Sequence, residues 1–567
     1  MKKYLIIIFV FLLNSSCEDY LDTTDYLKKS DQNFPQTKED MEQLLTGVYY
    51  SLSKVNIGST YYIGNLASDD QFGSGAANDA MAHGADRWKA ANPNMAADIW
   101  QYYFQGIYRT NKILETIDNV EFMDSKEKDI IEGEAYFLRA FFYSELSKLF
   151  GDVPLLIEST PVNIPRTPAD QTYAQIGQDL LKAIELLPSE NYNSGAYNPN
   201  RYGHATKWTA EALLARVYLF YTGYYQKDNI PLPDGDNISK NQVIAFLEDL
   251  IKNSGYQLVN DFRNLWVYTN EGTKEDYLYT KGKGLNWAGE NNSESLFEIQ
   301  YGLINNWGEP RNVIAQAFGV RGQSNINNVF PFGGNWGQGQ VNPNLIKDWG
   351  ELSPEDSIRK WGSVLDVDNP QEGIVKYEIG GWNMVEETKL FPKKVAIIRV
   401  WTDQSDPDRL NWKSYNHNIV FDGLGSGYNN ASILNLVLIR YADVLLMHSE
   451  LTQTADGINR VRERAGLPPV NYTLENLQKE RRYELAFEGL RYFDLLRWYG
   501  KDAGRIIDQN QNGEDILNDK VPGKYNANLT ERIEQTGGFM QIPESQILLS
   551  GGVLKQNDGW QGSQASL

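Results

Sequence analysis

The sequence predicts a mostly α-helical protein, a tetratricopeptide-like helical-repeat scaffold with long irregular loops and a few short strands. Three observations lead to this fold class. Apolar residues recur at three- and four-residue steps towards both ends of the chain, which is the period of a helix. The helical segments follow one another as pairs joined by short turns, without a strict sequence repeat. Between them, residues 262–430 lose the period and are dominated by Gly, Asn and Trp.

The first 36 residues are predicted to be a leader and a tether. Two lysines precede an apolar run that ends at Leu13, and this run is too short to cross a bilayer core of about 30 Å as a helix. Residues 1–16 therefore read as a secretory signal peptide. Cys17, the lone cysteine of the 567-residue chain, follows directly, and two or more acyl chains on such a thiol anchor a protein stably. We expect lipidation at Cys17 and an acidic tether over 17–36; the alternative is an ordinary cleaved signal peptide.

Composition narrows the class of protein further. With Cys17 as the only cysteine, an internal disulfide and a cysteine-based metal site are both excluded. The net charge of −21 disfavours nucleic acid as a partner. No second run of about twenty apolar residues exists, so membrane contact is expected through the lipid anchor only. The chain has 34 Tyr, 14 Trp and 22 Phe, and Tyr and Trp offer the flat faces on which sugar rings pack.

The N-terminal half contains the clearest helix signals. Thr37–Asp40 has the form of a capping box and opens a periodic stretch that continues through Tyr49. Residues 58–95 have no period and are predicted to be a long loop. Helical spacing returns over Trp100–Ile117, Glu134–Phe150 and Ala205–Tyr225, and Gly151 with Pro154 ends the second of these.

The C-terminal half begins irregular and ends helical. Ser295–Tyr301 and Lys394–Trp401 are predicted to be short strands within the loop-rich segment. Apolar residues from Leu438 to Ser449 share one helical face, and Ile458–Ala465 forms a shorter helix. Glu480–Trp498 is predicted to be a single helix in which acidic and basic residues recur at steps of three and four.

Five stretches, in chain order, carry a resemblance to a known family. They are Cys17–Asp22, Glu134–Leu155, Ala205–Leu219, Arg440–Trp498 and Gln541–Trp560. On these motifs the sequence resembles the SusD/RagB family of outer-membrane nutrient-binding lipoproteins. Two positions depart from the family pattern: Leu13 lies one place further from the cysteine than usual, and Asp558 stands where proline is more common.

The resemblance implies a lipid-anchored outer-membrane protein that faces outward on the surface of a Gram-negative bacterium. It implies a lid on a SusC-like TonB-dependent β-barrel transporter, which captures an oligosaccharide or polysaccharide and passes it on. It also divides the mature chain into an N-terminal helical region, 37–230, and a C-terminal RagB/SusD region, 231–567, which includes the loop-rich segment 262–430.

Charged residues within the matched motifs are interpreted as structural. They lie among apolar neighbours in helices, so we expect buried ion pairs that connect helices and not a catalytic cluster. The residues concerned are Arg139, Arg440, Asp443, Glu484, Glu488 and Arg491.

Glycan contacts are therefore expected outside these helices, on the irregular segments. Aromatic rings supply the platform, and nearby carboxylates and phenols bond the sugar hydroxyls. The candidates are Trp88, Trp287, Trp307 and Trp336 for stacking, with Tyr61, Tyr62, Asp69 and Asp70 as companions.

One segment has the spacing of a calcium loop. Asp508, Asn510 and Asn512 stand at positions 1, 3 and 5, Gly513 at 6, and Asp519 at 12. Because position 12 lacks the bidentate Glu, an ordinary Asn-Gly turn is the alternative. We expect no required cofactor, with a structural Ca²⁺ as the one candidate.

Three function classes remain open. The four histidines have no HExxH spacing, and neither a GxSxG motif nor a phosphate-binding loop occurs. A glycosidase carboxylate pair is defined by its spatial separation and stays open. We expect a glycan-binding protein and not an enzyme; the alternatives are a peptide- or other nutrient-capturing lipoprotein of the same family and, less favoured, a surface glycosidase.

Overall fold

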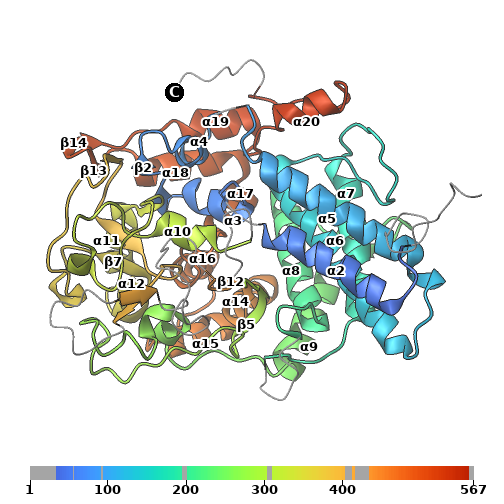
Figure 1. The fold of residues 1–567 in the computed structure, drawn as a ribbon, viewed down its shortest axis with the longest axis horizontal. Coiled ribbons are helices and arrows are strands. Elements are labelled where there is room, and N and C mark those ends of the chain that lie inside the picture. The colour runs from blue at the N-terminus through green and yellow to red at the C-terminus, as the bar shows by residue number, and fades with distance from the viewer. Residues whose placement is uncertain are drawn as a thin grey trace, which may run out of the picture.

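A computed structural model describes most of the chain after the predicted leader (Figure 1). The described residues are 34–54, 57–90, 93–193, 201–302, 310–401, 412–414 and 433–560. Long helices occupy one half of the molecule, and shorter helices, short strands and loops occupy the other half. The predicted fold class is confirmed.

Six helices of the first half of the chain lie side by side, and each packs against the next (Figure 1). Two C-terminal helices, α14 (Tyr441–Thr452) and α17 (Arg491–Tyr499), pack on the last members of this stack. The six are α2 Lys38–Ser53, α5 Ala97–Thr116, α6 Ser125–Phe150, α7 Ala169–Leu186, α8 Lys207–Tyr224 and α9 Lys240–Asn253.

The predicted helix boundaries have visible causes. The Thr37 side chain accepts from the amide of Asp40, and the Asp40 carboxylate accepts from the Thr37 amide, so the expected capping box is present. Helix α6 ends at Gly151, whose φ of 72° is left-handed and therefore suits glycine. Thr206 caps α8 in the same reciprocal way as Thr37 caps α2.

Residues 58–95 are not the single long loop that the sequence predicts. They contain α3 and α4, two buried helices too short to display a helical period. The remaining helices are α3 Thr60–Leu66, α4 Ala80–Asp86, α10 Val313–Phe318, α11 Pro343–Leu352, α12 Ser357–Ser363, α14 Tyr441–Thr452, α15 Asp456–Arg464, α16 Leu474–Glu484, α17 Arg491–Tyr499, α18 Ala503–Gln511, α19 Leu529–Thr536 and α20 Glu544–Leu549. Single 3₁₀ turns are η2 Ile117–Asn119, η4 Phe262–Leu265, η5 Val267–Thr269, η6 Ile326–Val329, η7 Pro370–Glu372 and η9 Gly500–Asp502.

Strands in the described residues form two-stranded antiparallel sheets. The pairs are β1 Gln71–Phe72 with β6 Gln340–Val341, β2 Gly75–Ala76 with β8 Met384–Val385, β3 Ile230–Pro231 with β4 Asn237–Ile238, β5 Ser295–Ile299 with β12 Leu436–Arg440, β7 Val364–Asp366 with β9 Leu390–Pro392, β10 Arg399–Trp401 with β11 Trp412–Ser414, and β13 Asp515–Asn518 with β14 Val521–Lys524. Pairs β1–β6 and β2–β8 bring residues 71–76 onto the loop-rich segment.

Several predicted elements differ from the observed ones in their bounds, and one predicted helix is two. The strand expected over Lys394–Trp401 is confined to Arg399–Trp401. Leu438 belongs to β12, so the following helix starts only at Tyr441. Glu480–Trp498 is two helices, because the backbone turns between Glu484 and Arg491.

The turn between α16 and α17 is fixed by close backbone contact. Phe487 and Gly489 have left-handed φ values of 66° and 77°. A Cβ at Gly489 would lie 2.7 Å from the Cα of Tyr61, so glycine lets the turn lie against α3. The side chain of Asn65 clamps the contact by accepting from the Gly489 amide at 2.9 Å and donating to the Phe487 carbonyl at 3.3 Å.

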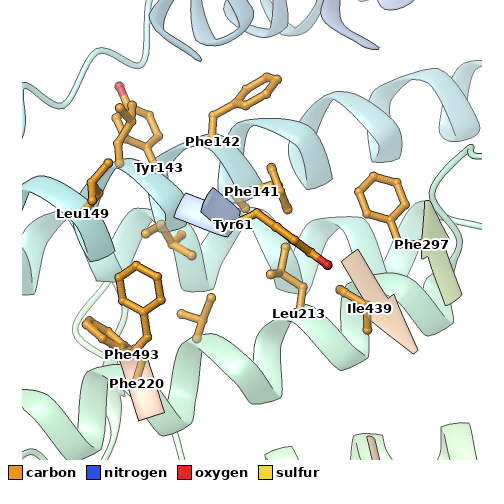
Figure 2. Close-up of a cluster of buried hydrophobic side chains, with 14 of the residues drawn as sticks. Tyr61, Phe141, Phe142, Tyr143, Leu149, Leu213, Phe220, Phe297, Ile439 and Phe493 are labelled. Carbon is orange, nitrogen blue, oxygen red and sulfur yellow. The ribbon is translucent and has the colours of Figure 1, made fainter. Parts of the chain in front are cut away.

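The main hydrophobic core fills the space between the helix stack and the β5–β12 pair (Figure 2). Phe297 of β5 packs edge-on against Phe137 and Phe141 of α6, with ring centres 5.1 and 6.0 Å apart. Phe493 of α17 packs on Phe220 of α8 at 6.3 Å. Burial of such rings contributes roughly 25 cal/mol per Å² of apolar surface.

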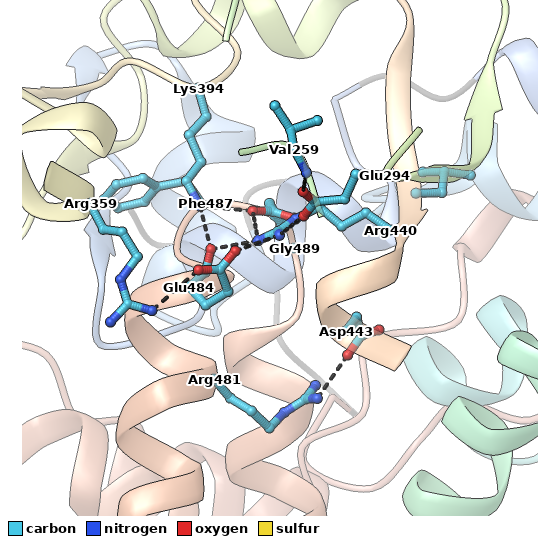
Figure 3. A network of polar contacts seen from close by, with 12 residues as sticks. Val259, Glu294, Arg359, Lys394, Arg440, Asp443, Arg481, Glu484, Phe487 and Gly489 are labelled. Atoms are coloured by element: carbon cyan, nitrogen blue, oxygen red, sulfur yellow. Dashed lines mark hydrogen bonds and ion pairs between the residues drawn. The ribbon is translucent and has the colours of Figure 1, made fainter. Parts of the chain in front are cut away.

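A buried network of charges joins the C-terminal helices to the rest of the molecule (Figure 3). Arg440, at the end of β12, donates to Glu294 at 2.8 Å, to Glu484 at 2.6 Å and to Glu488 at 2.7 Å. Lys394 also donates to Glu488, at 2.7 Å. Burial alone would raise the pKa of Glu484, but Arg464, Arg440 and Arg359 outweigh it and hold that pKa well below its usual range.

Three further ion pairs confirm the structural interpretation of the motif charges. Asp443 of α14 accepts from Arg216 of α8 at 2.6 Å and from Arg481 of α16 at 2.7 Å. Arg139 of α6 makes a two-pronged pair with Asp179 of α7, at 2.8 and 2.7 Å. Each pair connects different helices, as expected.

Replacing Glu484 with Gln leaves several buried cations short of a carboxylate. We expect the free energy of unfolding to fall by about 3–5 kcal/mol, measured by urea denaturation. The matched control is Glu475→Gln on the same helix, where the carboxylate is 75% exposed and pairs with Lys479; no change is expected there. Equal stability of the two variants would contradict the structural role of the network.

Candidate functional site

Trp382 is the one tryptophan among the large apolar side chains that the described structure leaves well exposed, at 59%. It follows Gly380 and Gly381 in a turn that leads into β8. The φ angles of Trp382 and of Asn383 are 53° and 54°, in the left-handed region, which costs an L-residue roughly 1–2 kcal/mol. Strain of this kind, combined with an exposed indole, marks the turn as a functional candidate.

Arg321 connects Trp382 to a second tryptophan, Trp336. Its Nη1 donates to the carbonyl of Trp336 at 2.8 Å, and its Nη2 donates to the carbonyl of Trp382 at 3.2 Å. The guanidinium carbon lies 5.5 Å from the centre of the Trp382 ring, within cation–π range. Trp336 is half-buried and packs in part against the main core, and its carbonyl links it through Arg321 to Trp382.

Backbone contact fixes the Trp382 turn to the neighbouring segment. A Cβ at Gly381 would lie 2.0 Å from the carbonyl oxygen of Gly322. Only glycine permits this approach, and Gly322 itself has a left-handed φ of 58°. The two segments that carry Arg321 and Trp382 are therefore in direct contact.

A carboxylate completes the surface. Asp79, which precedes α4, lies 3.8 Å from Arg321 Nη1 and accepts from the Ala76 amide at 2.7 Å. We refer to Asp79, Arg321, Trp336 and Trp382 as the Trp336–Trp382 face. Indole faces pack against C–H groups, while a guanidinium and a carboxylate donate to and accept from hydroxyls. This combination suits a sugar chain.

Trp88 and Tyr62 were predicted to contact glycan, and the structure contradicts both. Each side chain is 0% exposed. Trp88 packs on Tyr492 with ring centres 5.0 Å apart and donates its indole N–H to Thr536. Tyr62 stacks on Phe318 and donates to Gln338 at 2.6 Å. Packing in the core has taken both rings away from solvent.

Asp69 and Asp70 are also buried, and their prediction as sugar ligands is wrong. Asp69 pairs with Arg491 at 2.8 Å and accepts from Asn510 at 2.7 Å. Asp70 accepts from Arg482 at 2.7 Å. The two carboxylates connect the segment after α3 to helices α16, α17 and α18.

Tyr61 and Trp287 come together, but not on an open surface. Both line a partly open cavity of about 70 Å³ next to β5 and β12. An engineered cavity of about 150 Å³ holds one benzene ring, so a sugar ring does not fit inside this smaller space. Tyr61 is 7% exposed and donates to the Phe487 carbonyl. Trp287 is half-buried and donates its amide to Thr269.

Two predicted residues lie outside the described part of the chain. These are Trp307 and Cys17. Glycan contact by Trp307 and lipidation of Cys17 stay predictions.

The predicted calcium residues do not form a calcium loop. Asp508 and Asn510 lie within helix α18, and the Asp508 carboxylate accepts from the amides of Leu529 and Thr530. Asn512 pairs with the backbone of Ala527, and Asp519 lies in the turn between β13 and β14. Among the described residues, no group of three or more Asp, Glu, His and Cys side chains is placed to hold a metal ion.

Three residues of the Trp336–Trp382 face were not predicted: Asp79, Arg321 and Trp382. Trp382 had a usable signal, because Gly380-Gly381-Trp382-Asn383 has the same composition as the segment around Trp336. Arg321 and Asp79 had none, since only the folded backbone brings them beside the indoles.

Among the described residues, no helix has both the length and the apolar character of a membrane span.

Known proteins resemble this chain over nearly its whole length. A family model described as starch-binding associating with outer membrane matches residues 19–219, and the SusD family model matches residues 293–560. SusD-like protein P2 of Formosa agariphila is 26% identical over 535 residues, which cover 88% of this chain and 91% of that protein. A SusD-like protein of Bacteroides ovatus is 23% identical over 528 residues, which cover 88% of this chain and 82% of that protein.

Solved structures share the fold. A laminarin-binding SusD-like protein has a TM-score of 0.69 at 24% identity, covering 92% of this chain and all of that one. Surface glycan-binding protein A of Bacteroides thetaiotaomicron, solved with laminarihexaose, has a TM-score of 0.67 at 19% identity over 92% of this chain and all of that one. Taken together, the two family models account for most of the sequence, and the chain belongs to the SusD family.

Proposed function

We propose that this protein captures a glycan at the cell surface on the Trp336–Trp382 face and passes it to a partner transporter without cleaving it. The observation that carries the proposal is the exposed Trp382 indole, which Arg321 joins to Trp336. Because the face is open, it suits an extended chain better than a single small molecule. Stacking and hydrogen bonds suffice for such capture, so the proposal calls for no cofactor.

Similar proteins support the class of ligand. The names of two similar structures include laminarin and laminarihexaose. Laminarin-type glucans are therefore the first polysaccharides to test. At this level of identity the likeness supports the fold, and the choice of glycan is part of the proposal.

Membership of the SusD family supports a transporter as the partner and the outer membrane as the location. We take the partner to be a SusC-like TonB-dependent β-barrel in the outer membrane, on which this protein acts as the lid. Anchoring through lipid on Cys17 would keep the protein at that surface, since two acyl chains hold a protein stably.

Trp382→Ala is expected to weaken binding of the recognised polysaccharide at least about tenfold, or about 1.4 kcal/mol, because it removes the exposed stacking surface. The measurement is retention of the protein without residues 1–17 in native gels that carry single polysaccharides. Trp336→Ala is expected to act in the same direction.

The matched control is Tyr50→Ala on α2, an aromatic side chain that is 40% exposed and distant in sequence from the face. Its retention is expected to equal that of the parent protein. Unchanged retention of Trp382→Ala on a polysaccharide that retards the parent would refute the assigned face. Release of sugar products during overnight incubation would overturn capture without cleavage.

A second candidate function is peptide capture, and one groove favours it. The groove has a volume of about 470 Å³ and lies between α5, residues 154–164 and α20. Tyr108, Val162 and Leu549 line it and are 43%, 50% and 74% exposed. Exposed apolar side chains that gather in one groove are a feature of sites that bind protein segments.

Leu549→Asp separates the two candidates. If glycan capture on the Trp336–Trp382 face is the function, this substitution leaves polysaccharide retention unchanged, since it alters a different surface. Fluorescence anisotropy with a labelled casein digest measures the alternative. Peptide binding by the parent that Leu549→Asp abolishes, together with no retention on any polysaccharide, would favour peptide capture.

A further inference from the structure

The turn that presents Trp382 contains an unusual number of left-handed residues. Trp382, Asn383, Glu386 and Lys389 are not glycine, yet their φ values are 53°, 54°, 53° and 66°. Each costs roughly 1–2 kcal/mol relative to an ordinary backbone conformation. Such a turn keeps its shape only if surrounding contacts impose it.

Glu386 supplies the strongest of these contacts. Its side chain is 3% exposed and forms an ion pair with Arg87, the residue that directly follows α4. Its second oxygen lies 3.6 Å from Nδ1 of His83, which is on the same helix. The Glu386 amide donates to the side chain of Asn518 in β13 at 3.0 Å. One residue thus ties the turn to α4 and to the β13–β14 hairpin.

We propose that Glu386 is a positioning residue for Trp382, and that its buried ion pairs with Arg87 and His83 hold the strained turn in the shape that presents the indole. Glu386 itself does not touch the ligand. The inference rests on the proposed glycan capture for its functional consequence, but not for the anchoring itself.

Other charged groups surround this anchor on every side. Asp86 of α4 is fully buried and lies against the backbone of Gly73 and the side chain of Tyr525. The Arg87 guanidinium carbon lies 5.6 Å from the centre of the Tyr525 ring, which follows β14. Glu387, the next residue of the turn, accepts from the Gly380 amide at 2.7 Å. Arg321 and Asp79 face the outer side of the turn.

These surroundings make the charge state of the anchor depend on pH. Burial alone would raise the pKa of Glu386, but His83 and Arg87 lower it, so Glu386 is ionised through the neutral range. Burial lowers the pKa of His83, yet the Glu386 carboxylate outweighs burial and raises that pKa above 6.5. Burial and Glu386 together raise the pKa of Asp86 to about 7.

The signs of the two shifts near neutrality agree. A raised His83 pKa contributes stability below about pH 6.5 that is lost as pH rises through the folded value. A raised Asp86 pKa costs the folded state stability as pH rises from the unfolded pKa of 3.8 towards about 7, and above about 7 the folded carboxyl is itself ionised. At slightly acid pH the anchor therefore has a charged His83 and a neutral Asp86, and rising pH discharges His83 and ionises Asp86 beside Glu386.

Hydrogen exchange followed by mass spectrometry tests the anchoring without any ligand. In Glu386→Gln, the amides of residues 382–389 are expected to exchange at least about tenfold faster than in the parent. Arg87→Gln is expected to do the same, and the double variant is expected to add little, because both remove one ion pair.

The matched control is Asp515→Asn, an exposed carboxylate of the adjacent hairpin that pairs with Lys524. It is expected to leave exchange in residues 382–389 unchanged. Thermal unfolding of every variant confirms that the molecule is folded. Parent-like exchange in both Glu386→Gln and Arg87→Gln would overturn the anchoring role.

Polysaccharide retention at about pH 6 and about pH 8 tests the functional consequence. The parent is expected to bind at least about threefold more weakly at the higher pH, and Glu386→Gln to bind weakly at both. Faster exchange in Glu386→Gln with parent-like retention and pH response would overturn positioning. If Trp382→Ala also retains parent-like binding, the proposed glycan-binding face is wrong. The exchange data still test whether Glu386 anchors the turn.

Discussion

The pairing of Arg440 with Glu484 and Glu488 is the constraint on which the rest of the structure depends. A guanidinium that is 3% exposed must find carboxylates, because an unpaired buried charge costs several kcal/mol. Both carboxylates lie at the turn between α16 and α17, so Arg440 fixes that turn against β12 and β5. That turn also binds α3, because the Tyr61 and Asn65 side chains donate to the carbonyl of Phe487. Elements from the start, middle and end of the chain thus meet at one cation.

The same principle explains how so much irregular backbone is kept in place. Polar groups of buried loops need partners, and here long basic side chains supply them. Arg399, which is 0% exposed, donates to the carbonyl of Phe332 at 2.7 Å, and Lys393 donates to the carbonyl of Trp361 at 2.8 Å. Burial lowers the pKa of Lys393 to about 8, although its pair with Glu372 at 2.6 Å opposes the shift. Short two-stranded sheets contribute little by comparison, so charged anchors take the place of a continuous sheet.

How far the sequence predicts this molecule depends on whether the deciding contact is local. The helices at Glu134–Phe150 and Ala205–Tyr225 follow from apolar period and capping, which neighbouring residues determine. The sequence does not predict the turn at Phe487, because acidic and basic residues recur at helical spacing on both sides of it. The contact that fixes the turn is made by Tyr61, which is far away in sequence. Trp88 and Trp382 show the same limit at the site: both lie beside polar residues, yet one is fully buried and the other 59% exposed. Composition identifies an aromatic-rich loop region, but only packing decides which indole reaches water.

The contact between Gly322 and Gly381 has a consequence for how such a protein diversifies. These glycines join two surface turns directly through backbone, and the ion pairs of Arg440 are made by other segments. Side chains at the tips of the turns can therefore change without disturbing the helical stack, provided that both glycines and the Glu386 anchor remain. Exchange of a few residues at the tips would give a new ligand preference on an unchanged body. A lineage exposed to many different polysaccharides benefits from this arrangement, because ligand preference can change while the fold is kept.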